Sequence, residues 1–430
     1  MDKFLITGGT PLHGAIRVSG AKNSALPCMA AAILTEDEVV LENIPQVRDI
    51  DTERKLLSSM GAEVDLSQPH LTRIRCAVLS DPVAKYEIVK TMRASSLVLG
   101  PLVARTGLAR VAIPGGCAIG GRPIDLHIKG LEKMGAEIIQ AHGYIEARAE
   151  RLKGAHIVFD KITVTGTEDL IMAATLAEGE TLMENCAREP EVSDLAALLT
   201  KMGAHIEGAG TSTIRVRGVD HLRGARHQII PDRIEAGTFL IAGAITGGDL
   251  TVANCDTSHL GAVIAKIQEA GVQVDIFSPD SIRVRPNGKL LPADISTEEY
   301  PGFPTDMQAQ FMALVTQAEG VSSVKENIFE NRFMHVQELV RMGANIKVDG
   351  RTATVRGPAR LSGAYVMCSD LRASASLVLA ALIAEGQSVL DRVYHMDRGY
   401  EHIEEKLRSV GAKIERVSTA ADPADESAAP

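Results

Sequence analysis

The stretch Met60-Gly61-Ala62-Glu63-Val64 decides the fold, because related stretches recur along the whole chain. Counted between their glycines, the intervals are 74, 68, 68, 72 and 68 residues, and the glycines are Gly61, Gly135, Gly203, Gly271, Gly343 and Gly411. Each glycine follows a segment with apolar residues at helical spacing, such as Leu195 to Met202, and precedes an apolar run. The pattern predicts that each glycine ends a helix and that a strand begins after it.

Two further features recur upstream of each glycine. Short β-type runs end at Glu42-Asn43, Glu184-Asn185, Ala253-Asn254, Glu326-Asn327 and Asp391-Arg392. Ahead of each run lies a helical segment of small and apolar residues, at 25–34, 97–104, 170–177, 238–244, 308–316 and 373–384. Helices without a polar face are normally fully buried. Each repeat therefore reads helix, strand, helix, strand, with a further strand pair such as 155–159 with 162–164.

The six repeats predict an α/β protein made of two pseudo-threefold domains. Amphipathic layers around buried helices fit three repeats in one globule better than six in a row. The Pro-, Arg- and Gly-rich stretch 221–233 is the natural crossover between the domains. We therefore place one domain at residues 22–230 and the other at residues 1–21 plus 231–418, followed by a disordered tail at 419–430.

Composition excludes several classes of protein. Lys and Arg number 45 against 55 Asp and Glu, and a net charge of −10 argues against nucleic-acid binding through a general basic surface. The apolar runs are shorter than the ~20 residues of a membrane span. The first residues form no signal-peptide apolar region, so we expect a cytoplasmic protein. Six widely spaced cysteines predict neither a disulfide framework nor a metal site.

An insertion distinguishes the second repeat from the others. It reads Pro114-Gly115-Gly116-Cys117-Ala118-Ile119-Gly120-Gly121-Arg122-Pro123, and its four glycines predict a flexible loop. A thiol beside Arg122, just before a helix that starts near Pro123, has its thiolate favoured by the charge and by the helix dipole. We interpret Cys117 as functional, with an inert packed thiol as the alternative, and the other five cysteines as structural.

Cations stand at the starts of several predicted helices, where they oppose the helix dipole. The buried helices begin with Lys22-Asn23, Arg93 and Arg372, and Arg332 and Arg398 lie near the starts of second helices. Cations and bare helical N–H groups together bind anions, so this set suits a ligand with both carboxylate and phosphate groups. Taken singly, each cation is also consistent with a solvated side chain or an ion pair.

Asp306 occupies the same helix-start position that carries cations in other repeats. An Asp in a first helical turn is an ordinary cap, whereas a carboxylate facing a cleft could serve as a general base for a hydroxyl group. Asp370, beside Arg372, allows the same two interpretations.

Together these residues resemble the enolpyruvyl transferases over residues 1 to about 418. The resemblance rests on the Cys117 loop with Lys22-Asn23, Arg93, Asp306 and Arg398. It is to the branch that acts on UDP-N-acetylglucosamine, because the shikimate-pathway branch shares the fold but is not expected to carry this loop. The resemblance implies an inside-out α/β barrel of two domains that closes over phosphoenolpyruvate and the sugar nucleotide.

The implied reaction is an addition–elimination without metal or cofactor, the first committed step of peptidoglycan synthesis. The sugar 3-hydroxyl attacks C2 of phosphoenolpyruvate, C3 gains a proton, and loss of phosphate leaves the enol ether. Cys117 would donate that proton and form a covalent adduct, and the epoxide antibiotic fosfomycin would alkylate it. Asp306 would take the hydroxyl proton. Phosphate and carboxylate would be held by Lys22, Arg122 and Arg398.

The resemblance also implies residues that line the sugar-nucleotide site. They are Asn23, Arg93, Arg122, Pro123, Ile124, Asp125, Leu126, Lys161, Thr163, Val164 and Ile328. We add Arg332, Asp370 and Arg372 to the substrate-binding residues because of their positions at helix starts. The stretch 163–167 reads Thr-Val-Thr-Gly-Thr where the family more often has Ser-Val-Gly, which bears on the uridine-side contacts.

Three alternatives stay open at this point. A shikimate-pathway transferase would share the fold. A repeat ring of the sliding-clamp type would carry Lys and Arg along helix faces that line a hole, whereas here they gather at helix starts. A redox sensor at Cys117 would need a second cysteine close in space. The sequence does not indicate an oligomeric state.

Overall fold

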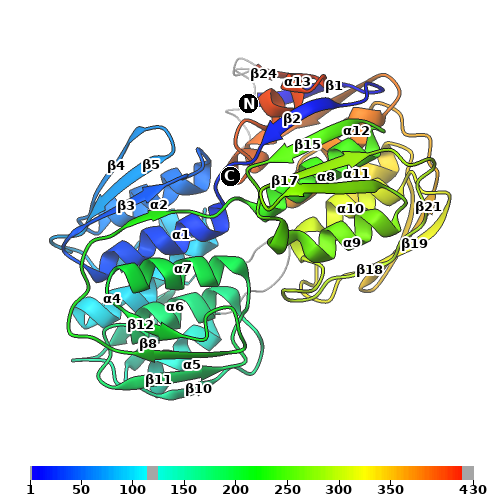
Figure 1. Cartoon of the computed structure of the whole chain (residues 1–430). Helices are drawn as coiled ribbons and strands as arrows, with labels where there is room; N and C mark the ends of the chain where they lie inside the picture. Colours follow the sequence, from blue (N-terminus) through cyan, green and yellow to red (C-terminus); the bar gives the residue numbers. More distant parts are fainter. Residues whose placement is uncertain (1, 114–123, 419–430) are drawn as a thin grey trace. The chain divides into compact units, whose positions relative to one another are not determined.

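The structure, a computed structural model, describes residues 2–113 and 124–418. These residues form two compact units (Figure 1). The Lys22 unit comprises residues 19–113 and 124–231, and the Asp306 unit comprises residues 2–18 and 232–418. The predicted Cys117 loop at 114–123 and the predicted tail at 419–430 lie outside the described residues.

The Lys22 unit is built around three buried helices, α1 (Lys22–Ala31), α4 (Leu99–Thr106) and α6 (Val164–Ala174). Its outer helices are α2 (Arg48–Ser59), α5 (Asp125–Lys133) and α7 (Pro190–Lys201), and its short helical segments are η1 (Ala32–Leu34), α3 (Tyr86–Val89) and η2 (Arg93–Val98). All residues of α1 except Asn23 are buried, because a run of Ala, Met, Cys and Leu offers no polar face.

Three separate four-stranded sheets cover these helices. The first has the order β14 (Arg226–Gln228), β3 (Glu38–Glu42), β5 (Leu71–Arg75), β4 (Glu63–Gln68). The second has the order β6 (Val83–Ala84), β7 (Leu108–Ala112), β9 (Tyr144–Arg148), β8 (Glu137–Ala141). The third has the order β10 (His156–Val158), β11 (Glu180–Glu184), β13 (Thr213–Arg217), β12 (His205–Glu207).

The Asp306 unit repeats this plan. Its buried helices α8 (Arg233–Ile245), α10 (Gln308–Val315) and α12 (Leu371–Ile383) contact one another. Its outer helices are α9 (Gly261–Glu269), α11 (His335–Arg341) and α13 (Ile403–Ser409), and its short segments are η3 (Thr257–Leu260), η4 (Thr305–Met307) and η5 (Val393–Arg398).

The sheets of the Asp306 unit also number three. Their orders are β16 (Gln273–Ser278), β17 (Ser281–Arg285), β15 (Asp249–Ala253), β2 (His13–Arg17); then β18 (Ile295–Ser296), β19 (Gly320–Lys325), β21 (Thr352–Gly357), β20 (Asn345–Asp349); and β22 (Tyr365–Met367), β23 (Gln387–Asp391), β1 (Asp2–Thr7), β24 (Lys413–Ser418). The first two strands of the chain thus pair with strands from its second half.

The predicted class, an α/β protein of six repeats with small-residue helices inside, is confirmed. The described strands form six open sheets around the small-residue helices, which lie inside as the prediction requires, and no closed strand barrel. One detail of the prediction is wrong. The expected strand pair 155–159 with 162–164 is absent from the described residues, because β10 pairs in parallel with β11 while Val164 already begins α6.

The repeated glycines end helices as predicted, with φ between 84° and 109° at all six positions. Four of the five recurring pairs at strand ends have a conformational reason that the sequence did not reveal; Asn327 of the fifth pair is not among the positive-φ residues. Asn43, Asn185, Asn254 and Arg392 adopt positive φ of 57–59°, a conformation that Asn tolerates better than most residues. The Asn43 amide also donates to Ile229 O at 2.9 Å, and the Asn185 amide to Phe159 O at 2.9 Å, which ties each turn to its neighbouring strand.

In the part of the chain that the structure describes, no helix is both long and apolar enough to cross a membrane.

Candidate active site

Asp306 lies between two buried guanidinium groups in the Asp306 unit. Its Oδ1 accepts a hydrogen bond from Arg332 Nη2 at 2.8 Å, and its Oδ2 accepts one from Arg372 Nε at 3.2 Å. The two arginine side chains are 6% and 4% exposed, whereas the carboxylate is 26% exposed. Asp306 makes no side-chain cap at the start of α10. The geometry therefore favours a partly open carboxylate held by two cations over the capping interpretation.

Arg372 is a buried cation with an unused donor. It is the second residue of α12, and its guanidinium lies 5.2 Å from the centre of the Tyr400 ring. Burial opposes the charge, but Tyr400, Asp306 and Asp232 together raise the pKa of Arg372 above its ordinary value. Its Nη1 is buried and has no hydrogen-bond partner among the described residues. A charged donor in this state suits an anionic oxygen.

Asp370 is an ordinary helix cap, unlike Asp306. Its Oδ1 accepts hydrogen bonds from Arg372 N at 2.9 Å and Ala373 N at 3.0 Å, at the start of α12. Two aspartates in similar sequence positions thus have different surroundings. The difference arises because the Asp306 carboxylate turns toward cations from α12 and from the segment before α11.

Arg398 and Ile328 also belong to the Asp306 unit. Arg398 is the last residue of η5 and follows Asp397, whose carboxylate accepts two hydrogen bonds from Arg416, at 2.6 and 3.1 Å. Ile328 follows β19, and its N–H donates to Glu326 Oε1 at 2.9 Å. Both residues are half-buried.

Lys22 is the first residue of α1 and is ion-paired. Its Nζ lies 3.2 Å from Asp49 Oδ2, and both side chains are buried. Asn23 follows it and is half-buried. Arg93 begins η2, which contacts α1, so the predicted helix-start cations Lys22 and Arg93 belong to neighbouring elements of one unit.

Glu53, one turn after Asp49 on α2, is fully buried, and neither of its carboxyl oxygens has a hydrogen-bond partner among the described residues. Burial, helped by Asp49, raises its pKa from 4.5 to about 8. Between pH 4.5 and about pH 8, the Glu53 carboxyl group has lost its proton in the unfolded chain but keeps it in the folded protein. Stability from this group is therefore full at acidic pH and falls by up to about 1.4 kcal/mol per pH unit toward pH 8.

We expect Glu53→Gln to remove this pH dependence. The midpoint of thermal unfolding of the variant, relative to the wild type, should rise as the pH is raised from 5 to 8. Glu63→Gln, an exposed substitution in the same unit, is the control and should show no such trend. Equal pH profiles for Glu53→Gln and wild type would contradict the interpretation.

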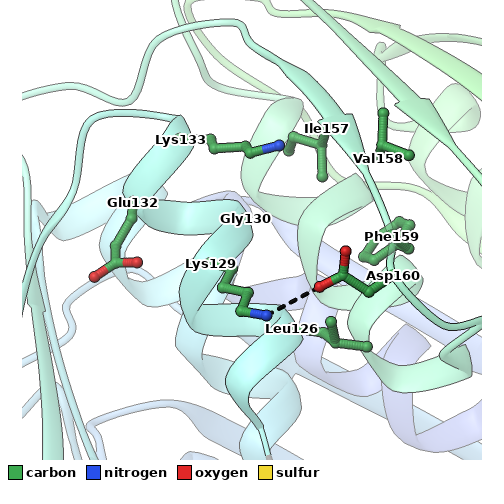
Figure 2. Close-up of a pocket in the computed structure, with 9 residues that line it drawn as sticks. All are labelled: Leu126, Lys129, Gly130, Glu132, Lys133, Ile157, Val158, Phe159 and Asp160. Carbon is green, nitrogen blue, oxygen red and sulfur yellow. Dashed lines mark hydrogen bonds and ion pairs between the residues drawn. The ribbon is translucent and has the colours of Figure 1, made fainter.

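The residues at 124–126 and 161–164, which are expected to line the sugar-nucleotide site, lie around the start of α5 and the start of α6. A pocket of about 420 Å³ lies here. Figure 2 shows the residues that line it, which are Leu126, Lys129, Gly130, Glu132, Lys133, Ile157, Val158, Phe159 and Asp160. Across it, Lys129 Nζ bonds Asp160 Oδ2 at 3.0 Å. Leu126 and Asp160 both line this pocket, and Asp160 directly precedes the exposed Lys161. Ile124 is buried just before α5, and Asp125, its first residue, is exposed.

The departure at 163–167 has a local explanation. Thr163 caps α6 by accepting a hydrogen bond from Gly166 N at 3.2 Å, and Val164 is the first residue of that helix. Thr165 Oγ1 lies 3.2 Å from His127 Nε2, and His127 Nδ1 lies 3.0 Å from the buried Asp169. The hydroxyl of Thr165, an exposed residue, therefore contacts the buried His127–Asp169 pair, which links α5 to α6.

The five described cysteines are all buried, as expected for structural thiols. Burial raises the pKa of Cys76 to about 11 and that of Cys368 to about 12, so neither is a ready nucleophile. Cys117, Arg122 and Pro123, which the sequence places in the site, lie outside the described residues.

Within the described ranges 2–113 and 124–418, one group of buried side chains could offer metal ligands, namely Cys28, Asp194 and His227 in the Lys22 unit. These groups already have partners. Asp194 accepts hydrogen bonds from Ser24 and from Ile230 N and bonds His227 Nε2 at 2.8 Å, while Lys201 Nζ lies 2.9 Å from His227 Nδ1. The adjacent ammonium group disfavours a further cation, so we interpret this group as a structural network below the start of α1.

The six-repeat fold, with Asp306 held between two arginines in one unit, can be compared with known proteins. The family described as "EPSP synthase (3-phosphoshikimate 1-carboxyvinyltransferase)" matches residues 6–407, and the chain belongs to this family of enolpyruvyl transferases. Solved structures agree. The chain is similar to the enolpyruvyl transferase NikO from Streptomyces tendae, with a TM-score of 0.87, 26% identity, and coverage of 97% of this chain and 99% of that one. EPSP synthase from Acinetobacter baumannii, at 18% identity and a TM-score of 0.75 over 97% of this chain and 100% of that one, shows the shared fold.

Curated relatives narrow the class. Three proteins named UDP-N-acetylglucosamine 1-carboxyvinyltransferase are similar over 97% of this chain. They are 78% identical in Acidobacterium capsulatum, 72% in Koribacter versatilis and 65% in Solibacter usitatus, and the matches span 96%, 97% and 100% of those proteins. The resemblance drawn from the sequence is confirmed at the level of the enzyme family.

Proposed function

We propose that this enzyme transfers the enolpyruvyl group of phosphoenolpyruvate to the 3-hydroxyl of UDP-N-acetylglucosamine and releases phosphate. The proposal rests on one observation. Over 97% of its length, the chain is 65–78% identical to three proteins named UDP-N-acetylglucosamine 1-carboxyvinyltransferase. The shikimate-pathway alternative shares the family and the fold, but the identity to that enzyme from Acinetobacter baumannii is only 18%.

The Asp306 cluster provides groups for the addition step. Asp306 accepts the proton of the sugar 3-hydroxyl as that oxygen bonds to C2 of phosphoenolpyruvate, while the C2=C3 electron pair takes a proton at C3. Loss of a C3 proton then reforms the double bond, and the C2–O bond to phosphate breaks. Arg372 and Arg332 offer guanidinium forks to the substrate anion beside this carboxylate.

The remaining roles are carried over from the resemblance. Cys117 supplies the proton to C3, and Lys22, Arg122 and Arg398 hold the phosphate and carboxylate groups. The sugar nucleotide contacts Asn23, Arg93, residues 122–126, residues 161–164 and Ile328. We take each compact unit to be one of the two domains that the repeats predict.

The test is phosphate release. Phosphoenolpyruvate and UDP-N-acetylglucosamine together should release phosphate, while either alone should not, and prior incubation with fosfomycin should abolish the release. Shikimate 3-phosphate replaces the sugar nucleotide as the control acceptor. Release with shikimate 3-phosphate and none with the sugar nucleotide would overturn the proposal in favour of its alternative.

A further inference from the structure

A single buried carboxylate joins two loops of the Asp306 unit. Glu326 follows β19 and is 1% exposed. Its Oε1 accepts hydrogen bonds from Ile328 N at 2.9 Å and Phe329 N at 3.1 Å, and from the Thr297 hydroxyl at 2.9 Å. Its Oε2 accepts one from the Thr305 hydroxyl at 2.9 Å. Glu326 therefore fixes the loop that carries Ile328 to the turn that carries Asp306.

The Thr305 hydroxyl links Glu326 to Arg332, the cation beside Asp306, by one hydrogen bond to each. A threonine hydroxyl has one proton and two lone pairs, and here the proton is given to Glu326. The Thr305 oxygen consequently presents a lone pair to Arg332 Nη1, which lies 3.2 Å away. With Nη1 held by Thr305, Nη2 of the same guanidinium donates to Asp306 Oδ1 at 2.8 Å. The ring of Phe329, whose N–H is bound by Glu326, lies 5.2 Å from that guanidinium.

We propose that Glu326 and Thr305 are positioning residues, which orient Arg332 and through it the Asp306 carboxylate for proton transfer. This inference rests on the proposed function, because it assigns the effect to the step in which Asp306 takes part. A guanidinium fork is a rigid plane, so fixing one of its N–H groups sets the direction of the other. Neither Glu326 nor Thr305 needs to touch the substrate.

Thr305→Val and Thr305→Ser test the inference with little change in side-chain volume. Valine removes the hydrogen bonds to Glu326 and Arg332, so kcat for phosphate release should fall about tenfold, while KM for both substrates stays near the wild-type value. Serine keeps the hydroxyl group and should restore kcat. Thr246→Val, which removes a half-buried hydroxyl at the far end of α8 in the same unit, is the matched control and should leave kcat unchanged.

A double-substitution cycle separates positioning from a general structural effect. If Thr305 acts through Asp306, Thr305→Val should cause no further loss in an Asp306→Asn background. An equal loss in both backgrounds, wild-type kcat in Thr305→Val, or no recovery in Thr305→Ser would each overturn the inference. Glu326→Gln gives a second check, because it weakens the same hydrogen bonds and should also lower kcat. Absence of phosphate release by the unaltered enzyme would count against the proposed function instead.

Discussion

Asp306→Asn is expected to lower kcat for phosphate release by about 10²–10⁴-fold, the range typical of losing a general base. The amide has nearly the same shape as the carboxylate but cannot accept the hydroxyl proton. It also turns an N–H₂ group toward Arg332 or Arg372, whose N–H donors lie 2.8 and 3.2 Å from the present oxygens. Steady-state phosphate release with both substrates saturating measures the effect.

The control for Asp306→Asn is Asp256→Asn in the same unit. Asp256 caps η3 by accepting a hydrogen bond from Ser258 N at 3.0 Å, and Asn caps a helix about as well as Asp. This control should retain wild-type turnover. Turnover within a few-fold of wild type for Asp306→Asn would show that another group accepts the proton.

The repeats made most of the fold predictable, because the same local pattern occurs six times, once in each repeat. Gly61 and its five counterparts needed a left-handed conformation, and only that requirement explains a glycine at every helix end. The strand pair at 155–164 failed for a local reason. Thr163 is a good cap as well as a good strand residue, and the cap prevailed once Gly166 N was within reach.

The candidate site was less predictable, because its geometry depends on tertiary contacts. Asp306 and Asp370 occupy similar positions in the sequence, yet one binds two guanidinium groups and the other caps a helix. The sequence marks Glu326 only as part of the repeated Glu-Asn pair. Tyr400 gave no signal at all, although its hydroxyl lies 2.9 Å from Thr238 Oγ1 and its ring underlies Arg372. Buried polar networks join residues that are far apart in the chain, and no local pattern marks them.

Arg372→Met is expected to lower kcat/KM for phosphoenolpyruvate by about 10²–10³-fold, as loss of a preorganised charged donor does elsewhere. Methionine fills a similar volume but removes both the hydrogen bond to Asp306 and the unused Nη1 donor. Arg372→Lys should recover only part of the loss. The lysine ammonium group is a compact charge without the planar fork of a guanidinium. It therefore cannot donate to Asp306 and also hold a second N–H group in the direction of a substrate oxygen.

Initial rates as a function of phosphoenolpyruvate, at saturating sugar nucleotide, measure this effect. Arg356→Met, at an exposed position on β21 of the same unit, controls for loss of a positive charge and should leave the rates unchanged. Removing Arg372 still leaves Asp306 paired with Arg332, so the variant should remain folded, which thermal unfolding can check. A folded Arg372→Met enzyme with wild-type kcat/KM would show that the unused donor of this buried cation has no part in binding the substrate anion.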